Sequence, residues 1–106
     1  MTRSALNKSK VENSKQQILA AAIRVSARPN GWAKLTRDTV AIEAGCATGL
    51  VSKYFGTMQT FRRAIMRECV RIECVAVIAQ GLAAGDPNAR KASDALKRKA
   101  LDTLAA

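Results

Sequence analysis

The feature that most constrains this chain is Gly45, which stands between two short segments with helical spacing. The first segment follows Thr36, a residue suited to a helix N-cap, and the second begins at Thr48. Glycine accepts left-handed backbone angles and so ends a helix without a steric penalty. Two short helices joined by such a turn are typical of a helix-turn-helix unit. Small or apolar residues occupy the predicted crossing of the two helices: Val40, Ala41, Ala44, Cys46 and Val51.

The other side chains of the second helix, predicted over residues 48–54, point away from that crossing. They are short, mostly uncharged and free of carboxylates: Thr48, Gly49, Leu50, Ser52 and Lys53. Such a face suits a helix whose N-terminal end approaches base edges in the major groove of DNA. A plain helical hairpin in a structural bundle is the alternative interpretation of the same pattern.

The charge of the chain favours a polyanionic partner. Eighteen Lys and Arg against eight Asp and Glu give a formal net charge of +10. Residues 1–60 carry nine basic and three acidic side chains, and residues 61–106 carry nine and five, so both halves are basic. A basic surface attracts nucleic acid, although it also serves solubility alone.

The rest of the chain predicts an all-α fold, because no strand-like alternation and no repeat is visible. We expect a flexible basic arm over residues 1–13 and a first helix from after Ser14 to about Arg28. Pro29, Asn30 and Gly31 then form a turn. After helices 37–44 and 48–54, we predict a long helix over 58–82 and a last helix that starts with Asp86 and Pro87 and ends near 104. The expected domains are a DNA-binding unit over 14–57 and dimerisation helices over 58–106.

Several functional classes are disfavoured by what the sequence lacks. It has no His, and the spacings of Cys46, Cys69 and Cys74 match no zinc motif, so we expect no metal site and no cofactor. Without paired carboxylates or an activated thiol, we expect no catalytic residue and no enzyme. No stretch is long and apolar enough to cross a membrane, and unpaired thiols suit a reducing cytoplasm. Only four aromatic residues are present, so a roomy small-molecule pocket is not expected.

Residues 17–61 resemble the DNA-binding domain of the TetR family of transcriptional regulators. The matching segments are "ILAAAI", the Gly31-Trp32 pair, "LTRDTVAIEAG", "TGLVSKYF" and the break with a capping residue before the next helix. The resemblance implies a three-helix DNA-binding unit in a bacterial, cytoplasmic, nucleoid-associated protein. It also implies a homodimer that binds a palindromic operator on double-stranded DNA and usually represses transcription.

The resemblance further assigns roles to individual residues. Thr36 stands at a phosphate-contacting position, Lys53 would reach the DNA backbone, and Tyr54 would contact phosphate unless it packs in the core. The base-facing start of the recognition helix is formed by Thr48, Gly49 and Leu50. The complete expected DNA face is Thr36, Arg37, Ala47, Thr48, Gly49, Leu50, Ser52, Lys53, Tyr54 and Thr57.

The chain departs from the family pattern at several positions. Ser52 replaces a usual Tyr, Met58 replaces a usual Lys, and Ser26 stands where a core Phe is common. We expect the N-terminal arm to restore some of the lost charge by following the DNA backbone or entering a minor groove. Its basic residues are Arg3, Lys8, Lys10 and Lys15.

The second half predicts dimerisation and no effector binding. Only 48 residues follow Met58, whereas the family usually continues much further, so no inducer pocket is expected. Apolar residues recur at interface-like spacing and predict a seam between two copies, with an intramolecular hairpin as the alternative. The predicted interface residues are Phe61, Ile65, Cys69, Ile72, Ala76, Ala79 and Leu96.

Two other functions remain open at this point. One is a protein-interaction module that binds a partner through helix 58–82, and the other is a nucleic-acid-binding protein without sequence preference.

Overall fold

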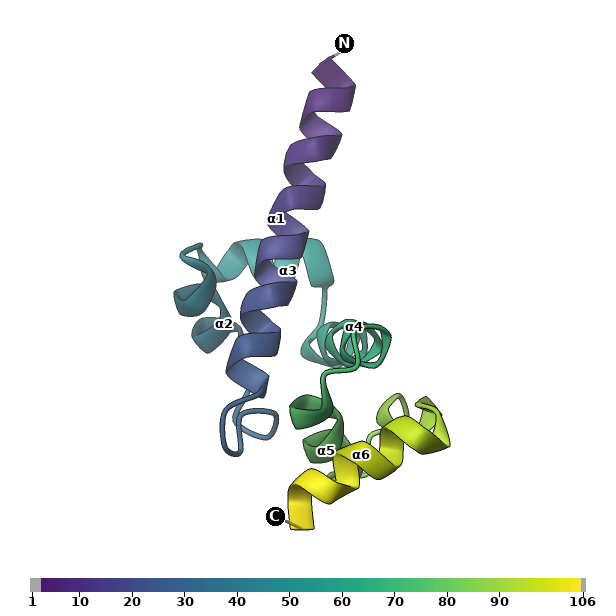
Figure 1. Ribbon diagram of the computed structural model, residues 1–106. Coiled ribbons are helices and arrows are strands. Elements are labelled where there is room, and N and C mark those ends of the chain that lie inside the picture. Colours follow the sequence, from purple (N-terminus) through teal and green to yellow (C-terminus); the bar gives the residue numbers. More distant parts are fainter. Residues whose placement is uncertain (1–2, 106) are drawn as a thin grey trace.

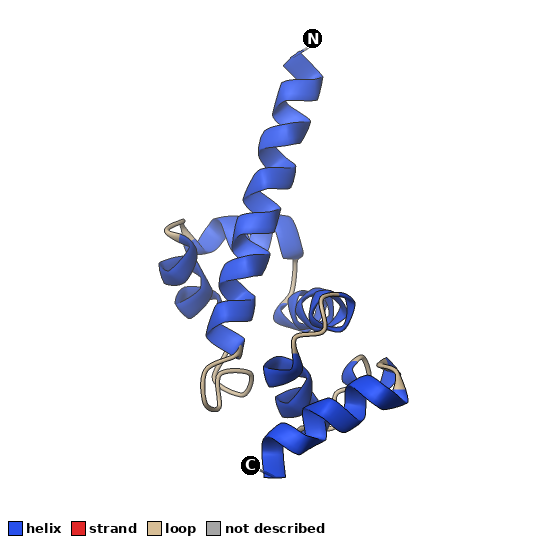
Figure 2. Cartoon of the chain, viewed as in Figure 1, coloured by secondary structure: helices blue, strands red, loops and turns tan. Residues whose placement is uncertain are grey.

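The structure, a computed structural model, describes residues 3–105, with side chains described over residues 12–105. Within that range the chain consists of helices joined by loops and turns and contains no strand, which confirms the predicted all-α class (Figure 2). The helices are α1 (Arg3–Ser26), α2 (Arg37–Ala44), α3 (Thr48–Phe55), α4 (Met58–Arg71), α5 (Val75–Ala83) and α6 (Asp94–Ala105). A short 3-10 helix (Ala89–Lys91) precedes α6.

The helices form an elongated molecule of 50 × 27 × 20 Å. In Figure 1 the N-terminal part of α1 projects beyond the other helices, and α2 and α3 lie along its second half. The α5 and α6 helices pack on each other at the opposite end, and α4 connects the two parts. The predicted helix-turn-helix therefore lies at the α1 side of the molecule.

The α2–turn–α3 segment forms as the sequence predicts. Thr36 caps α2 by accepting a hydrogen bond of 3.1 Å from the N–H of Thr39, and the Thr39 hydroxyl oxygen accepts one of 3.1 Å from the N–H of Thr36. Gly45 ends α2 in the left-handed conformation, with φ 69° and ψ 36°, where a Cβ would be strained. The Cys46 N–H then bonds to the Ala41 carbonyl at 3.0 Å, which closes the turn. The capping bonds at the start of α2 and the turn bond at its end together fix the direction in which α3 leaves α2.

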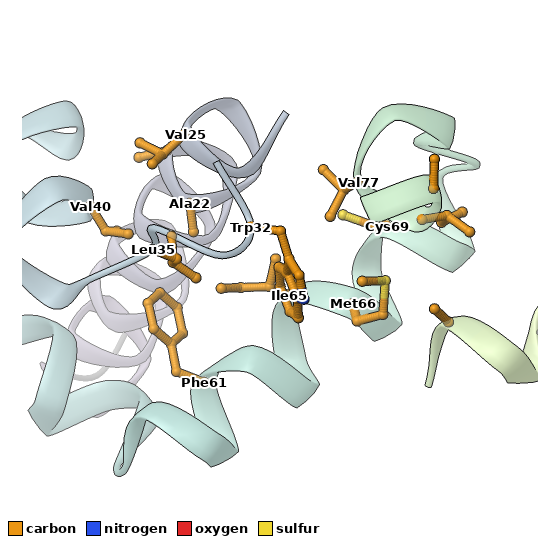
Figure 3. Close-up of a cluster of buried hydrophobic side chains, with 14 of the residues drawn as sticks. Ala22, Val25, Trp32, Leu35, Val40, Phe61, Ile65, Met66, Cys69 and Val77 are labelled. Carbon is orange, nitrogen blue, oxygen red and sulfur yellow. The ribbon is translucent and has the colours of Figure 1, made fainter. Parts of the chain in front are cut away.

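One hydrophobic core joins the two parts of the molecule (Figure 3). In that view Trp32 and Ile65 lie between Val25, Leu35 and Val40 on one side and Met66, Cys69 and Val77 on the other. Trp32 is only 4% exposed although it comes from the loop between α1 and α2. The single tryptophan therefore ties this loop to α4 and α5.

Polar side chains hold the same loop from outside the core. Gln80 on α5 accepts a hydrogen bond of 2.9 Å from the Trp32 N–H and donates to the Ser26 carbonyl at 2.7 Å. Arg62 on α4 donates to the Trp32 carbonyl at 2.7 Å, and its guanidinium stacks 4.8 Å from the centre of the indole ring. Burial lowers the pKa of Arg62, and the nearby Asp86 carboxylate opposes this effect. The helices after α3 thus fix the loop that leads into the α2–turn–α3 unit.

The N-terminal segment differs from the prediction of a flexible arm, because α1 begins at Arg3 and not after Ser14. Residues 3–13 contain neither Pro nor Gly. Once the buried part of α1 has formed, each further residue adds a hydrogen bond without a new nucleation cost. At the other end α1 stops at Ser26, two residues earlier than predicted, and Asn30 takes the predicted turn with φ 59°. Ser26 is fully buried, and its hydroxyl is one of the described buried groups without a hydrogen-bond partner.

The predicted long helix over 58–82 is wrong, because α4 and α5 are separate helices. Glu73 adopts φ 59°, and the Cys74 N–H bonds back to the Cys69 carbonyl at 2.8 Å. This pattern is a helix-ending turn in which a non-glycine residue takes the left-handed position. The break redirects the apolar segment of α5 so that α6 and α4 cover it.

The last helix also starts later than predicted, at Asp94 instead of residue 87. The Asp86 carboxylate does act as a cap, but it accepts from the N–H groups of Asn88 and Ala89 and closes only a 3-10 turn. Ser93 then caps α6 by accepting from the Leu96 N–H at 3.2 Å.

The predicted dimer seam lies mostly inside a single chain. Phe61, Ile65 and Cys69 are at most 1% exposed, and Ala79 and Leu96 are also buried. Since these side chains are buried within the chain itself, a second copy cannot contact them in this fold. Ile72 and Ala76 are the two predicted interface residues that stay exposed.

Candidate nucleic-acid interface

The N-terminal end of α3 is the most open part of the predicted DNA face. Ala47, Thr48, Gly49 and Lys53 are exposed, as the sequence predicts. A Cβ built on Gly49 would meet no heavy atom within 4 Å. The backbone at this point is therefore free to approach a ligand surface closely.

The remaining α3 residues are less available than predicted. Leu50 and Tyr54 are half-buried and pack against the core, so only part of each side chain faces outward. Ser52 is also half-buried. The sequence predicted that Leu50 points away from the crossing. In the structure Leu50 packs against the core, because an eight-residue helix needs more apolar contact than the buried Val51 alone provides.

A carboxylate lies beside the start of α3. The Thr48 hydroxyl donates a hydrogen bond of 2.9 Å to Oδ1 of Asp38, which stands in the first turn of α2. Ala47, at the N-cap of α3, has no side chain that can cap the helix. Asp38 thus supplies the negative charge that suits a helix N-terminus. The sequence shows Asp38 two positions after the cap of α2, and no local spacing signals its contact with a residue ten positions further on.

The three flanking residues predicted to contact DNA are held by the protein itself. The Thr36 hydroxyl donates to Thr39 Oγ1 at 3.2 Å while it caps α2, and Thr57 caps α4 by accepting from the Thr60 N–H at 3.1 Å. Arg37 donates to the Gly56 carbonyl at 3.3 Å, and its Nε is buried without a partner. Thr36 and Arg37 therefore act first as positioning residues for the α2–α3 unit, and Thr57 positions the start of α4.

Within α2 and α3, whose side chains are all described, the basic residues are Arg37 and Lys53, and of these only Lys53 is exposed. The Lys53 ammonium lies 5.9 Å from the Tyr54 ring centre and stays exposed, whereas Arg28 pairs with Glu43. Lys15 is half-buried on α1. The side chains of Arg3, Lys8 and Lys10, predicted to follow the DNA, lie outside the described residues; their backbone belongs to α1.

Several basic side chains of residues 61–106 line a groove between α4 and the 3-10 helix. Arg63 and Arg67 on α4 face Lys91 of the 3-10 helix across an open groove of about 480 Å³, which Val70 and Asn88 complete. These residues belong to neither α2 nor α3. The net charge of the chain therefore overstates the charge of the helix-turn-helix itself.

The described residues contain no group of three or more potential metal ligands among His, Cys, Asp and Glu. Burial raises the pKa of the Cys69 thiol, and the neighbouring Cys74 adds to the effect. Such a thiol is a poor nucleophile and a poor metal ligand. None of the helices described here has the length and apolarity needed to cross a membrane.

No protein-family model matches this chain, and searches of curated proteins and of solved structures found no match either. The resemblance to the TetR family therefore rests on the sequence segments given above.

Proposed function

We propose that this chain is a sequence-specific double-stranded DNA-binding regulator of transcription of the TetR type, acting as a repressor in the bacterial cytoplasm. The observation that carries the proposal is the exposed start of α3, where Thr48 and Gly49 stand on a firmly capped α2–turn–α3 unit. A helix held in this way can insert its N-terminal end into the major groove. Repression would follow from occupation of a promoter.

Two kinds of contact would bind the DNA. Lys53 and the basic residues of α1 would neutralise phosphates and release counterions, which supplies affinity without sequence preference. The start of α3 would meet base edges and supply the sequence preference. The clamp of Gln80 and Arg62 on the α1–α2 loop supports this role, because base reading requires a rigid recognition helix.

We further propose a homodimer, formed through residues other than the predicted seam. Leu101 and Leu104 lie three positions apart on α6 and are each 51% exposed. Leu104 also borders a groove lined by Ala83 and Ala84. Light scattering of the wild type should give twice 11.4 kDa, and Leu101→Glu with Leu104→Glu should give 11.4 kDa. A wild type that stays at the monomer mass contradicts this part of the proposal.

The test of DNA binding is fluorescence anisotropy of the whole chain on duplexes selected from a random pool, with scrambled duplexes alongside at two salt concentrations. A regulator of this type should bind its selected duplex on the order of a thousandfold more tightly than the scramble. Equal and weak binding to both duplexes, lost as salt rises, would leave only non-specific attraction to nucleic acid.

A further inference from the structure

The hydrogen bond between Thr48 and Asp38 determines which groups the start of α3 can recognise. It joins the first residue of α3 to the first turn of α2, and both side chains are exposed. A threonine hydroxyl has one hydrogen and two lone pairs, whereas an ionised carboxylate only accepts hydrogen bonds. The Thr48 hydrogen is therefore committed to Oδ1 of Asp38. Towards a ligand, both side chains present acceptors, together with one negative charge.

DNA offers few groups that can satisfy such a surface. Phosphate oxygens are negative acceptors, so the Asp38 carboxylate repels them at this point. In the major groove, guanine presents the acceptors N7 and O6, and thymine presents O4. The hydrogen-bond donors there are the amino groups at N4 of cytosine and N6 of adenine. The Asp38 and Thr48 side chains thus fit an amino-bearing base edge.

We propose that Asp38 and Thr48 form one base-reading unit, which accepts a hydrogen bond from the amino group of cytosine or adenine and rejects guanine and thymine at the same position. This inference rests on the proposed DNA-binding function and assigns part of its sequence preference to a residue outside the recognition helix. Within the unit, Asp38 sets the hydroxyl orientation, and acceptor oxygens of both Asp38 and Thr48 face the base.

A purely structural role for Asp38 makes a different prediction. A carboxylate near the N-terminus of α3 stabilises the helix dipole, and this effect needs no DNA. In that case Asp38→Asn lowers the stability of the protein and leaves its base preference unchanged. In the base-reading unit, the asparagine amide adds a donor that guanine and thymine can accept, so the preference at one position changes.

The experiment selects duplexes from a random pool with the whole chain as wild type, Asp38→Asn and Thr48→Val. Asp102→Asn, which removes an exposed carboxylate on α6, is the matched charge control. The wild type and Asp102→Asn should select a motif with one position restricted to cytosine or adenine. Asp38→Asn and Thr48→Val should relax that position by at least about fivefold in relative affinity and keep the rest of the motif.

Each outcome decides between the two proposals. If the wild type selects no motif, DNA recognition and the base-reading unit are both refuted. A motif that Asp38→Asn and Thr48→Val reproduce unchanged refutes the base-reading unit and leaves DNA recognition standing. Thr48→Ser retains the hydroxyl and must retain the cytosine-or-adenine preference. Circular dichroism checks that the variants fold, and the Val and Ser variants carry the test if Asp38→Asn does not.

Discussion

Replacing Gln80 with alanine tests whether α5 holds the α1–α2 segment that leads into the helix-turn-helix unit. The side chain makes three hydrogen bonds to the α1–α2 segment, with the Trp32 N–H at 2.9 Å, the Ser26 carbonyl at 2.7 Å and the Arg28 carbonyl at 3.1 Å. The first two are partly buried, and each contributes about 1 kcal/mol, while the exposed third contributes about half as much. Alanine regains about 0.4 kcal/mol through its higher helix propensity. Gln80→Ala should therefore lower the free energy of unfolding by about 2 kcal/mol.

The assay is urea unfolding followed by the fluorescence of Trp32, the only tryptophan in the chain. A slope of about 1–3 kcal/mol per molar urea, typical of small domains, converts the loss into a midpoint lower by about 1 M. Gln17→Ala is the matched control, since Gln17 is exposed on α1 and should gain only its helix propensity. Unfolding free energies that agree within about 0.5 kcal/mol for the two variants would refute the clamp.

Two further predictions concern the α4–α5 break. Burial raises the pKa of Cys69, so an aromatic disulfide reagent at pH 8 should modify Cys46 and Cys74 in the folded protein and Cys69 only after unfolding. Mass spectrometry of the peptides measures the modification of each thiol. Equal modification rates for the three thiols in the folded protein would contradict the prediction. Glu73→Gly should raise the free energy of unfolding by about 0.5–1 kcal/mol, because glycine adopts φ 59° without strain. A lower urea midpoint for this variant would show that the Glu73 side chain contributes more than its backbone costs.

Local signals were sufficient to predict the α2–turn–α3 unit. Thr36, Gly45 and Thr57 act through bonds within a few residues of themselves, and such bonds are visible in the sequence. The same reasoning placed the start of α2, the turn at Gly45 and the caps at Thr36 and Thr57 correctly.

Features that depend on distant contacts were not predictable in this way. An apolar stripe on α4 has the same spacing whether a second chain or α1, α3 and α5 of the same chain cover it, so Phe61 and Ile65 were assigned to a dimer seam. The break at Glu73 lacks the glycine that usually marks a left-handed residue. The contact of Asp38 with Thr48 exists only once the turn has brought α2 and α3 together.

The central claim is that the start of α3 enters the major groove, and Gly49→Leu tests it most directly. The position is open, so the leucine should leave the urea midpoint unchanged or raise it through a gain of about 0.5–1 kcal/mol in helix propensity. If α3 lies close to the DNA, the same leucine side chain should weaken the binding free energy by about 1–3 kcal/mol, which is roughly 5- to 150-fold in affinity for the selected duplex. Ala95→Leu, an exposed position on α6, is the control and should not change binding. A folded Gly49→Leu protein that binds the selected duplex as tightly as the wild type would contradict the account.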